Sequence, residues 1–139
     1  MKRIIGIVVL CLLLISNNSF ATIEFKQSKD ISTDTDHLRG IFIKPDGTRL
    51  YTTEDTDDDQ SVIEYSLSIP FDVSTATKLR KSSLAIGEGF FLSVMDNPHA
   101  IEFKPDGTEM YVIRSESAAR VSIEQFTLST PWDLSLIHI

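Results

Sequence analysis

The chain has 139 residues, of which 24% are charged, and its formal net charge is −7 at pH 7. An acidic chain of this kind is a poor nucleic-acid binder, because the neutralisation of phosphates supplies most of that affinity. The single cysteine, Cys11, lies close to the N-terminus, so the rest of the chain uses no disulfide. We therefore expect a protein that is held together by its core.

The first 21 residues have the composition of a secretory signal. Lys2 and Arg3 precede an apolar run over residues 4–15, and Ala21 closes a stretch of small residues suited to cleavage. This pattern predicts a signal peptide over residues 1–21 and a secreted or periplasmic protein. A retained membrane anchor is the alternative, although the run is shorter than the about 20 residues that span a bilayer.

Beyond the signal, the dominant feature is a repeat. The string Lys44–Thr48 recurs letter for letter as Lys104–Thr108, 60 residues later, and seven of the eleven positions from Ile41 to Tyr51 match those from Ile101 to Tyr111. A second pair of blocks follows, with residues 65–72 related to residues 126–133. A fixed period of this size predicts an array of equivalent supersecondary units.

Each unit contains short segments that are rich in branched and aromatic residues, as strands are. In both units the Lys-Pro-Asp-Gly-Thr string joins the first two segments, and it has the composition of a hairpin turn whose glycine takes the left-handed conformation. The sequence predicts strands at 40–43, 49–53, 61–67 and 78–86 in the first unit, and at 100–103, 109–113 and 122–128 in the second.

The strings Ile43–Tyr51 and Phe103–Tyr111 resemble the repeats of the WD40-like (PD40) and YVTN families of bacterial β-propellers. The resemblance implies an all-β fold over residues 22–133, with about two four-stranded antiparallel blades of an incomplete propeller ring. The repeat units are about 37–96 and 97–133, and the second is incomplete. Closed rings use about four to eight blades, so further blades of a longer chain are expected as partners. The alternative is a small β-sandwich or open meander.

Residues 134–139 can be back-translated into a string that resembles a transposon-derived sequencing adapter, so we expect a non-native tail there. Leu134 and Ser135 also suit the repeat, where Val73 and Ser74 stand in the first unit.

Two positions are candidates for ligand binding. Arg39 and His99 occupy the same place in the two units, at the start of the first strand, which lines the channel of a propeller. Histidine there is able to act as a base or a ligand. The alternative is a strand-start residue that bonds to a neighbouring loop.

An acidic loop in the first unit is the candidate metal site. Asp55, Asp57 and Asp59 alternate along it, and calcium prefers several oxygen ligands. The glycine and glutamate of an EF-hand loop are missing, and the second unit has no such cluster, so a solvated loop is the alternative.

The sequence contains no serine elbow, glycine-rich phosphate loop or cysteine–histidine zinc pattern. We therefore expect a binding or scaffolding module without a catalytic site, and no cofactor apart from the candidate calcium. Two alternatives remain: a fragment of a propeller enzyme of the lactonase or quinoprotein kind, and a calcium-binding surface or adhesion domain. The aromatic residues Phe71 and Trp132 are expected to pack the blade edge, with carbohydrate stacking as the alternative.

Overall fold

The computed structural model describes residues 23–35, 37–56, 60–84, 97–117, 120–135 and 137–138. Within these ranges the chain is built from strands, one short 3-10 turn and loops, and no α-helix occurs. None of the described segments is a helix that is long and apolar enough to cross a membrane. The predicted all-β class and the antiparallel pairing of the strands are confirmed.

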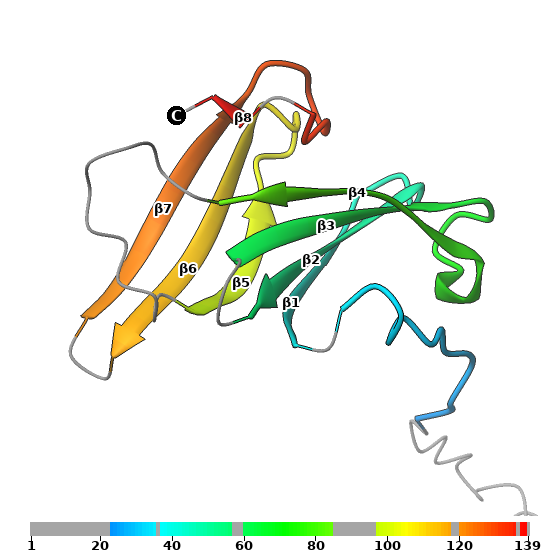
Figure 1. The fold of residues 1–139 in the computed structure, drawn as a ribbon. Coiled ribbons are helices and arrows are strands. Elements are labelled where there is room, and N and C mark those ends of the chain that lie inside the picture. Colours follow the sequence, from blue (N-terminus) through cyan, green and yellow to red (C-terminus); the bar gives the residue numbers. More distant parts are fainter. Residues whose placement is uncertain are drawn as a thin grey trace, which may run out of the picture.

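The strands form two antiparallel sheets, each in simple sequence order (Figure 1). We call them the first and second unit. The first contains β1 (Leu38–Ile43), β2 (Arg49–Asp55), β3 (Gln60–Leu67) and β4 (Ala76–Ser83), with the 3-10 turn η2 (Val73–Thr75) before β4. The second contains β5 (Asn97–Phe103), β6 (Glu109–Ser117), β7 (Arg120–Leu128) and the two-residue β8 (Ile137–His138).

The fourth strand of the first unit begins and ends earlier than the predicted 78–86. Asp72 caps η2 by accepting a hydrogen bond from the Ser74 backbone, and this short turn delivers the chain directly into β4 at Ala76. Residues 85–96 lie outside the described residues, and they include the apolar segment 90–95 that we expected to lead into the next unit.

Because side chains alternate across a strand, each unit has two faces, which we name by equivalent residues. The forward face carries Tyr51, Thr53 and Val62 in the first unit, and Tyr111, Ile113 and Ile123 in the second. The rear face carries Leu50, Thr52 and Tyr65 in the first unit, and Met110, Val112 and Phe126 in the second. In the folded chain the forward face of the first unit packs on the rear face of the second, with β1 beside β5 (Figure 1).

This stacking produces the main core, which joins the two units. Its buried members are Tyr51, Val62, Leu84, Ile101, Phe103, Met110, Val112, Phe126, Leu128 and Leu134. A second, smaller cluster lies on the rear face of the first unit and consists of Leu50, Ile63, Tyr65, Leu67 and Ala76. Ile31, from the segment before β1, packs against this second cluster.

The two repeated blocks of each unit contact one another. In the second unit the Trp132 backbone donates to the Gly107 carbonyl at 3.0 Å, and the indole covers the glycine so closely that an added Cβ would lie 2.2 Å from Nε1. Phe71 and Gly47 repeat both features. The glycines have φ of +74° and +73°, as the predicted turn requires, and the two aromatic residues are themselves left-handed, with φ of 63° and 66°. The hairpin turn and the corner after β3 thus form one structural module.

The start of the expected non-native tail is part of the packed structure. Leu134 is buried in the main core, and its carbonyl accepts a hydrogen bond from Ser82 Oγ at 2.9 Å. Asp133 accepts from the Ser135 backbone, as Asp72 does from Ser74 in the first unit. Leu134 and Ser135 therefore follow the repeat, and the origin of residues 136–139 stays a prediction.

Candidate functional site

The candidate ligand residues lie at the edge where β1 and β5 begin. Arg39, in β1, donates from Nε and Nη2 to one carboxylate oxygen of Asp55 at the end of β2, at 3.1 and 2.9 Å. The guanidinium side chain is 47% exposed, whereas the carboxylate side chain is 12% exposed. Asp55 thus holds the cation in place while leaving much of it accessible to solvent.

His99 makes the equivalent contact in the second unit. Its Nε2 lies 2.5 Å from the hydroxyl of Ser115, which occupies the place of Asp55 in the repeat. Arg39–Asp55 and His99–Ser115 are therefore matched cross-strand pairs at the same end of two adjacent sheets. The structure brings both candidate ligand residues to one edge, and each is bonded to a side chain of the adjacent strand, whereas the alternative expected a bond to a neighbouring loop. A role of the two residues in ligand binding stays a prediction.

Both residues lie where the pairing of the first strand shifts register. The shift falls between Leu38 and Ile41 in β1, and between Pro98 and Ala100 in β5. Such bulges redirect a side chain at the end of a strand. Gly40, inside the first bulge, approaches β5 so closely that an added Cβ would lie 3.0 Å from the Ala100 Cα. This close approach sets the position of Arg39 relative to the second unit.

A layer of buried charge lies near this edge. Glu54, at the rear of β2, forms an ion pair with Lys81 and accepts a hydrogen bond from Ser61 at 2.8 Å. Burial raises the pKa of Glu54, but the bonds from Lys81 and Ser61 prevail and hold it below its usual value. The carboxylate is therefore kept ionised and fully engaged inside the fold, where it is not available to a ligand.

In the second unit the place of Glu54 is taken by Arg114, which is also buried. Its Nη2 donates to the Leu84 carbonyl at 2.8 Å and its Nε lies 3.0 Å from Glu124, so this arginine ties the second unit to the end of the first. Arg114 thus acts as a structural link. The sequence analysis did not identify it, although an arginine in the otherwise apolar run of the second strand was a visible signal.

The expected calcium site is not assembled by the described residues. Asp55 is engaged by Arg39, and Asp57 and Asp59 lie outside the described residues. Within the described part of the chain, no three histidine, cysteine, aspartate or glutamate side chains are grouped closely enough to hold a metal ion. The calcium hypothesis therefore stays a prediction that rests on the sequence of the loop.

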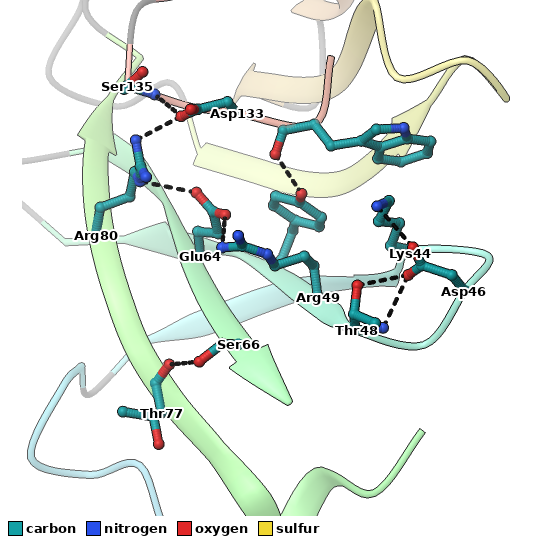
Figure 2. A network of polar contacts seen from close by, with 12 residues as sticks. Lys44, Asp46, Thr48, Arg49, Glu64, Ser66, Thr77, Arg80, Asp133 and Ser135 are labelled. Carbon is teal, nitrogen blue, oxygen red and sulfur yellow. Dashed lines mark hydrogen bonds and ion pairs between the residues drawn. The ribbon is translucent and has the colours of Figure 1, made fainter. Parts of the chain in front are cut away.

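A polar network crosses the interface between the units on the forward face of the first (Figure 2). The buried Glu64 lies 2.6 Å from Arg49 and 3.0 Å from Arg80, and Arg80 also contacts Asp133 of the second unit at 2.6 Å. Burial is the main influence on Glu64 and raises its pKa, despite the two arginines. Because every charge has a partner, this network has the character of a docking contact.

Tyr51 completes that contact. The Tyr51 hydroxyl donates to the Trp132 carbonyl at 2.7 Å, and burial raises the pKa of Tyr51. The Trp132 ring stacks near Phe42 and Phe103, with ring centroids 6.0 and 5.4 Å away. The aromatic corner of the second unit is thus packed between the units. Its counterpart Phe71 is 59% exposed.

The rear face of the first unit contains a cavity of about 290 Å³. It lies between the segment before β1 and the sheet, and its lining is mainly apolar, with Lys29 and Arg39 among the lining residues. Thr52 Oγ1, which belongs to the lining, is buried without a hydrogen-bond partner in the described part of the chain. Tyr65 also lines the cavity, and burial together with the nearby Asp34 raises its pKa to about 12.

Comparisons with known proteins add no family to this description. A scan against protein-family models gave no match, and neither the curated proteins nor the solved structures contain one that this chain matches.

Proposed function

We propose that this chain supplies blades of a β-propeller and acts as a secreted or periplasmic binding or scaffolding module. One observation carries the proposal: two sequence repeats form two antiparallel sheets of the same strand order, stacked face to face with their first strands adjacent. Radial repetition of four-stranded sheets around their first strands is the principle of a propeller. In this proposal the two units are neighbouring blades, and further blades complete the ring.

The binding surface in this proposal is the edge formed by Arg39 and His99. Loops and strand starts at this edge differ between the units, whereas the turns at the other end are the same. Variation of surface side chains on a constant scaffold is how repeat folds change their ligands. The half-exposed Arg39 and the exposed His99 would offer hydrogen-bond donors to an acidic or polar partner.

Recovery of the natural reading frame tests the propeller part. We expect the coding sequence to continue beyond the codon for Ser135 with further Lys-Pro-Asp-Gly-Thr-like turns about 60 residues apart, the spacing within this chain. A natural stop codon directly after residue 139 would overturn it. In a Gram-negative host we expect the periplasmic product to begin at Thr22, which mass spectrometry of the intact chain measures.

Site-specific photo-crosslinking in the native host tests the binding edge. A crosslinking amino acid at Arg39 or His99 is expected to capture a partner, whereas the same group at Ser68, exposed at the opposite end, is not. Equal capture at all three positions would contradict a role for this edge, and so would capture at Ser68 alone.

A further inference from the structure

The cavity on the rear face of the first unit is a feature that the proposed function does not use. Its volume is about 290 Å³, and it lies between the segment before β1 and the sheet. An apolar cavity of about 150 Å³ accommodates benzene, so this one has room for a molecule of about ten non-hydrogen atoms. Leu38 and Ile41 belong to its lining and are 38% and 64% exposed, so the cavity is accessible from solvent along β1.

The sheet wall of the cavity is more polar than the equivalent surface of the second unit. Thr52 and Tyr65 line the cavity. The same places in the second unit hold Val112 and Phe126, which are buried in the main core. Thr52 is only 3% exposed, and its Oγ1 has no hydrogen-bond partner among the described residues. Because a buried hydroxyl without a partner is unfavourable, this wall favours a ligand that brings a polar atom to Thr52.

The charged residues of the lining are both cations. Lys29 and Arg39 line the cavity, and none of the described residues that line it carries a carboxylate, although the net charge of the chain is −7. Asp55 offsets part of the charge of Arg39, but the Arg39 side chain stays 47% exposed. A concave site with cations and without carboxylates attracts an anion.

The other wall of the cavity comes from the segment before β1. Ile31 of this segment packs against the buried cluster on the rear face, and Asp34 lies 3.8 Å from Lys78 of β4. The cavity is therefore bounded by residues of this chain on both sides. A blade that completes the proposed ring would lie outside this segment, so the inference does not depend on the proposed function.

We propose that this cavity binds a small organic carboxylate with an apolar body. The apolar body packs against Ile41, Leu50 and the Tyr65 ring. The carboxylate is held by Lys29 and Arg39, and it accepts a hydrogen bond from the Thr52 hydroxyl, which gives that group the partner it lacks. The volume limits the ligand to the size of a medium-chain fatty acid or a single-ring aromatic acid.

Isothermal titration calorimetry of the purified full chain tests the class of ligand, with octanoate as the probe. Octanol and octylammonium carry the same apolar body with a neutral and a positive head group, and acetate has the carboxylate without the body. We expect octanoate to saturate one site with a dissociation constant of about 1 mM or less. The other three compounds are expected to bind about tenfold more weakly or not at all.

Substitutions locate the site. Lys29→Met removes an exposed cation of the lining and is expected to weaken octanoate binding about threefold, whereas the control Lys26→Met, on the same segment but outside the lining, leaves it unchanged. Thr52→Val installs the side chain of the second unit and is expected to weaken binding about fivefold. Ala76→Leu fills the cavity and is expected to abolish binding. Circular dichroism establishes that each variant is folded.

Four results would overturn the proposal. They are the absence of saturable octanoate binding, equal binding of octanoate, octanol and octylammonium, equal affinity in Lys29→Met and Lys26→Met, and unchanged affinity in a folded Ala76→Leu chain. The last result shows that the anion binds elsewhere. No variant changes Arg39 or His99, so these outcomes are separate from those of the crosslinking test of the binding edge.

Discussion

The two units of this protein share their turns, their strand order and their aromatic corners, and they differ in what covers them. The corner of the second unit is packed, with Trp132 near Phe42 and Phe103, whereas Phe71 at the same place in the first unit is largely exposed. The forward faces differ in the opposite direction: Val62 of the first unit is buried, whereas the equivalent Ile123 of the second unit is 73% exposed. The same local structure thus occurs in two environments. Comparing the two units separates the effects of a unit's own sequence from the effects of packing against its neighbour.

The largest expected effect comes from the glycine beneath the corner. Gly107→Ala adds a Cβ at a residue with φ of +73°, in the space that the packed Trp132 ring occupies. We expect a loss of about 3 kcal/mol in the free energy of unfolding, from backbone strain and overpacking together. Urea denaturation followed by tryptophan fluorescence and circular dichroism measures it.

Gly47→Ala is the matched control. Its turn has the same backbone strain, but the exposed Phe71 ring has room to move, so we expect about 1–2 kcal/mol. Equal losses for the two variants would show that the environment of the corner contributes nothing, and a smaller loss for Gly107→Ala would reverse the comparison.

A smaller effect is expected from the tyrosine hydroxyls. Tyr51→Phe removes the bond to the Trp132 carbonyl and leaves that oxygen without its partner between the units, which costs about 1–2 kcal/mol. Tyr111→Phe removes a half-buried bond to Glu109 Oε2, 2.6 Å long, that water replaces, so we expect a change close to zero. The same urea titration measures both changes. A loss of similar size at Tyr111 would indicate that its face is also covered.

The smallest expected effect is on the stability of the fold at low pH, and it distinguishes the hairpin turn that contains Asp46 from the turn that contains Asp106. A bond from Lys44 and two from Thr48 lower the pKa of Asp46 to about 2, and bonds from Thr108, followed by Lys104, lower that of Asp106 to about 2. Because the folded pKa of each aspartate lies below its ordinary value of 3.8, each group contributes stability that is present above pH 3.8 and is lost as the pH falls toward 2.

Thermal melts between pH 5 and pH 2 test this, and the double variant Asp46→Asn and Asp106→Asn should show a shallower acid decline than the parent. Added salt should weaken the contribution of Asp46 more, because its leading partner is the Lys44 ammonium, whereas that of Asp106 is the Thr108 hydroxyl. An acid decline that the double variant leaves unchanged would assign it to other carboxylates.

Much of the fold followed from the repeat. The glycine turns at Gly47 and Gly107, the antiparallel class and three strands of each unit were predicted close to their observed bounds. The fourth strand of the first unit was misplaced at both ends, because the 3-10 turn that Asp72 caps has no strong sequence signal. The candidate residues Arg39 and His99 were predicted to share one edge, but their partners Asp55 and Ser115 were not identified, since pairs 16 residues apart meet only through strand register.

The sequence by itself determined the local architecture, because turn glycines, strand periodicity and the corner motif depend on neighbouring residues alone. Only the tertiary structure decided which face of each sheet is buried. It also decided that Asp55 pairs with Arg39, and that Glu64 and Arg114 are buried with partners from other segments of the chain. Burial and ion pairing arise between segments that are distant in sequence, and the packing of one unit on the next sets them.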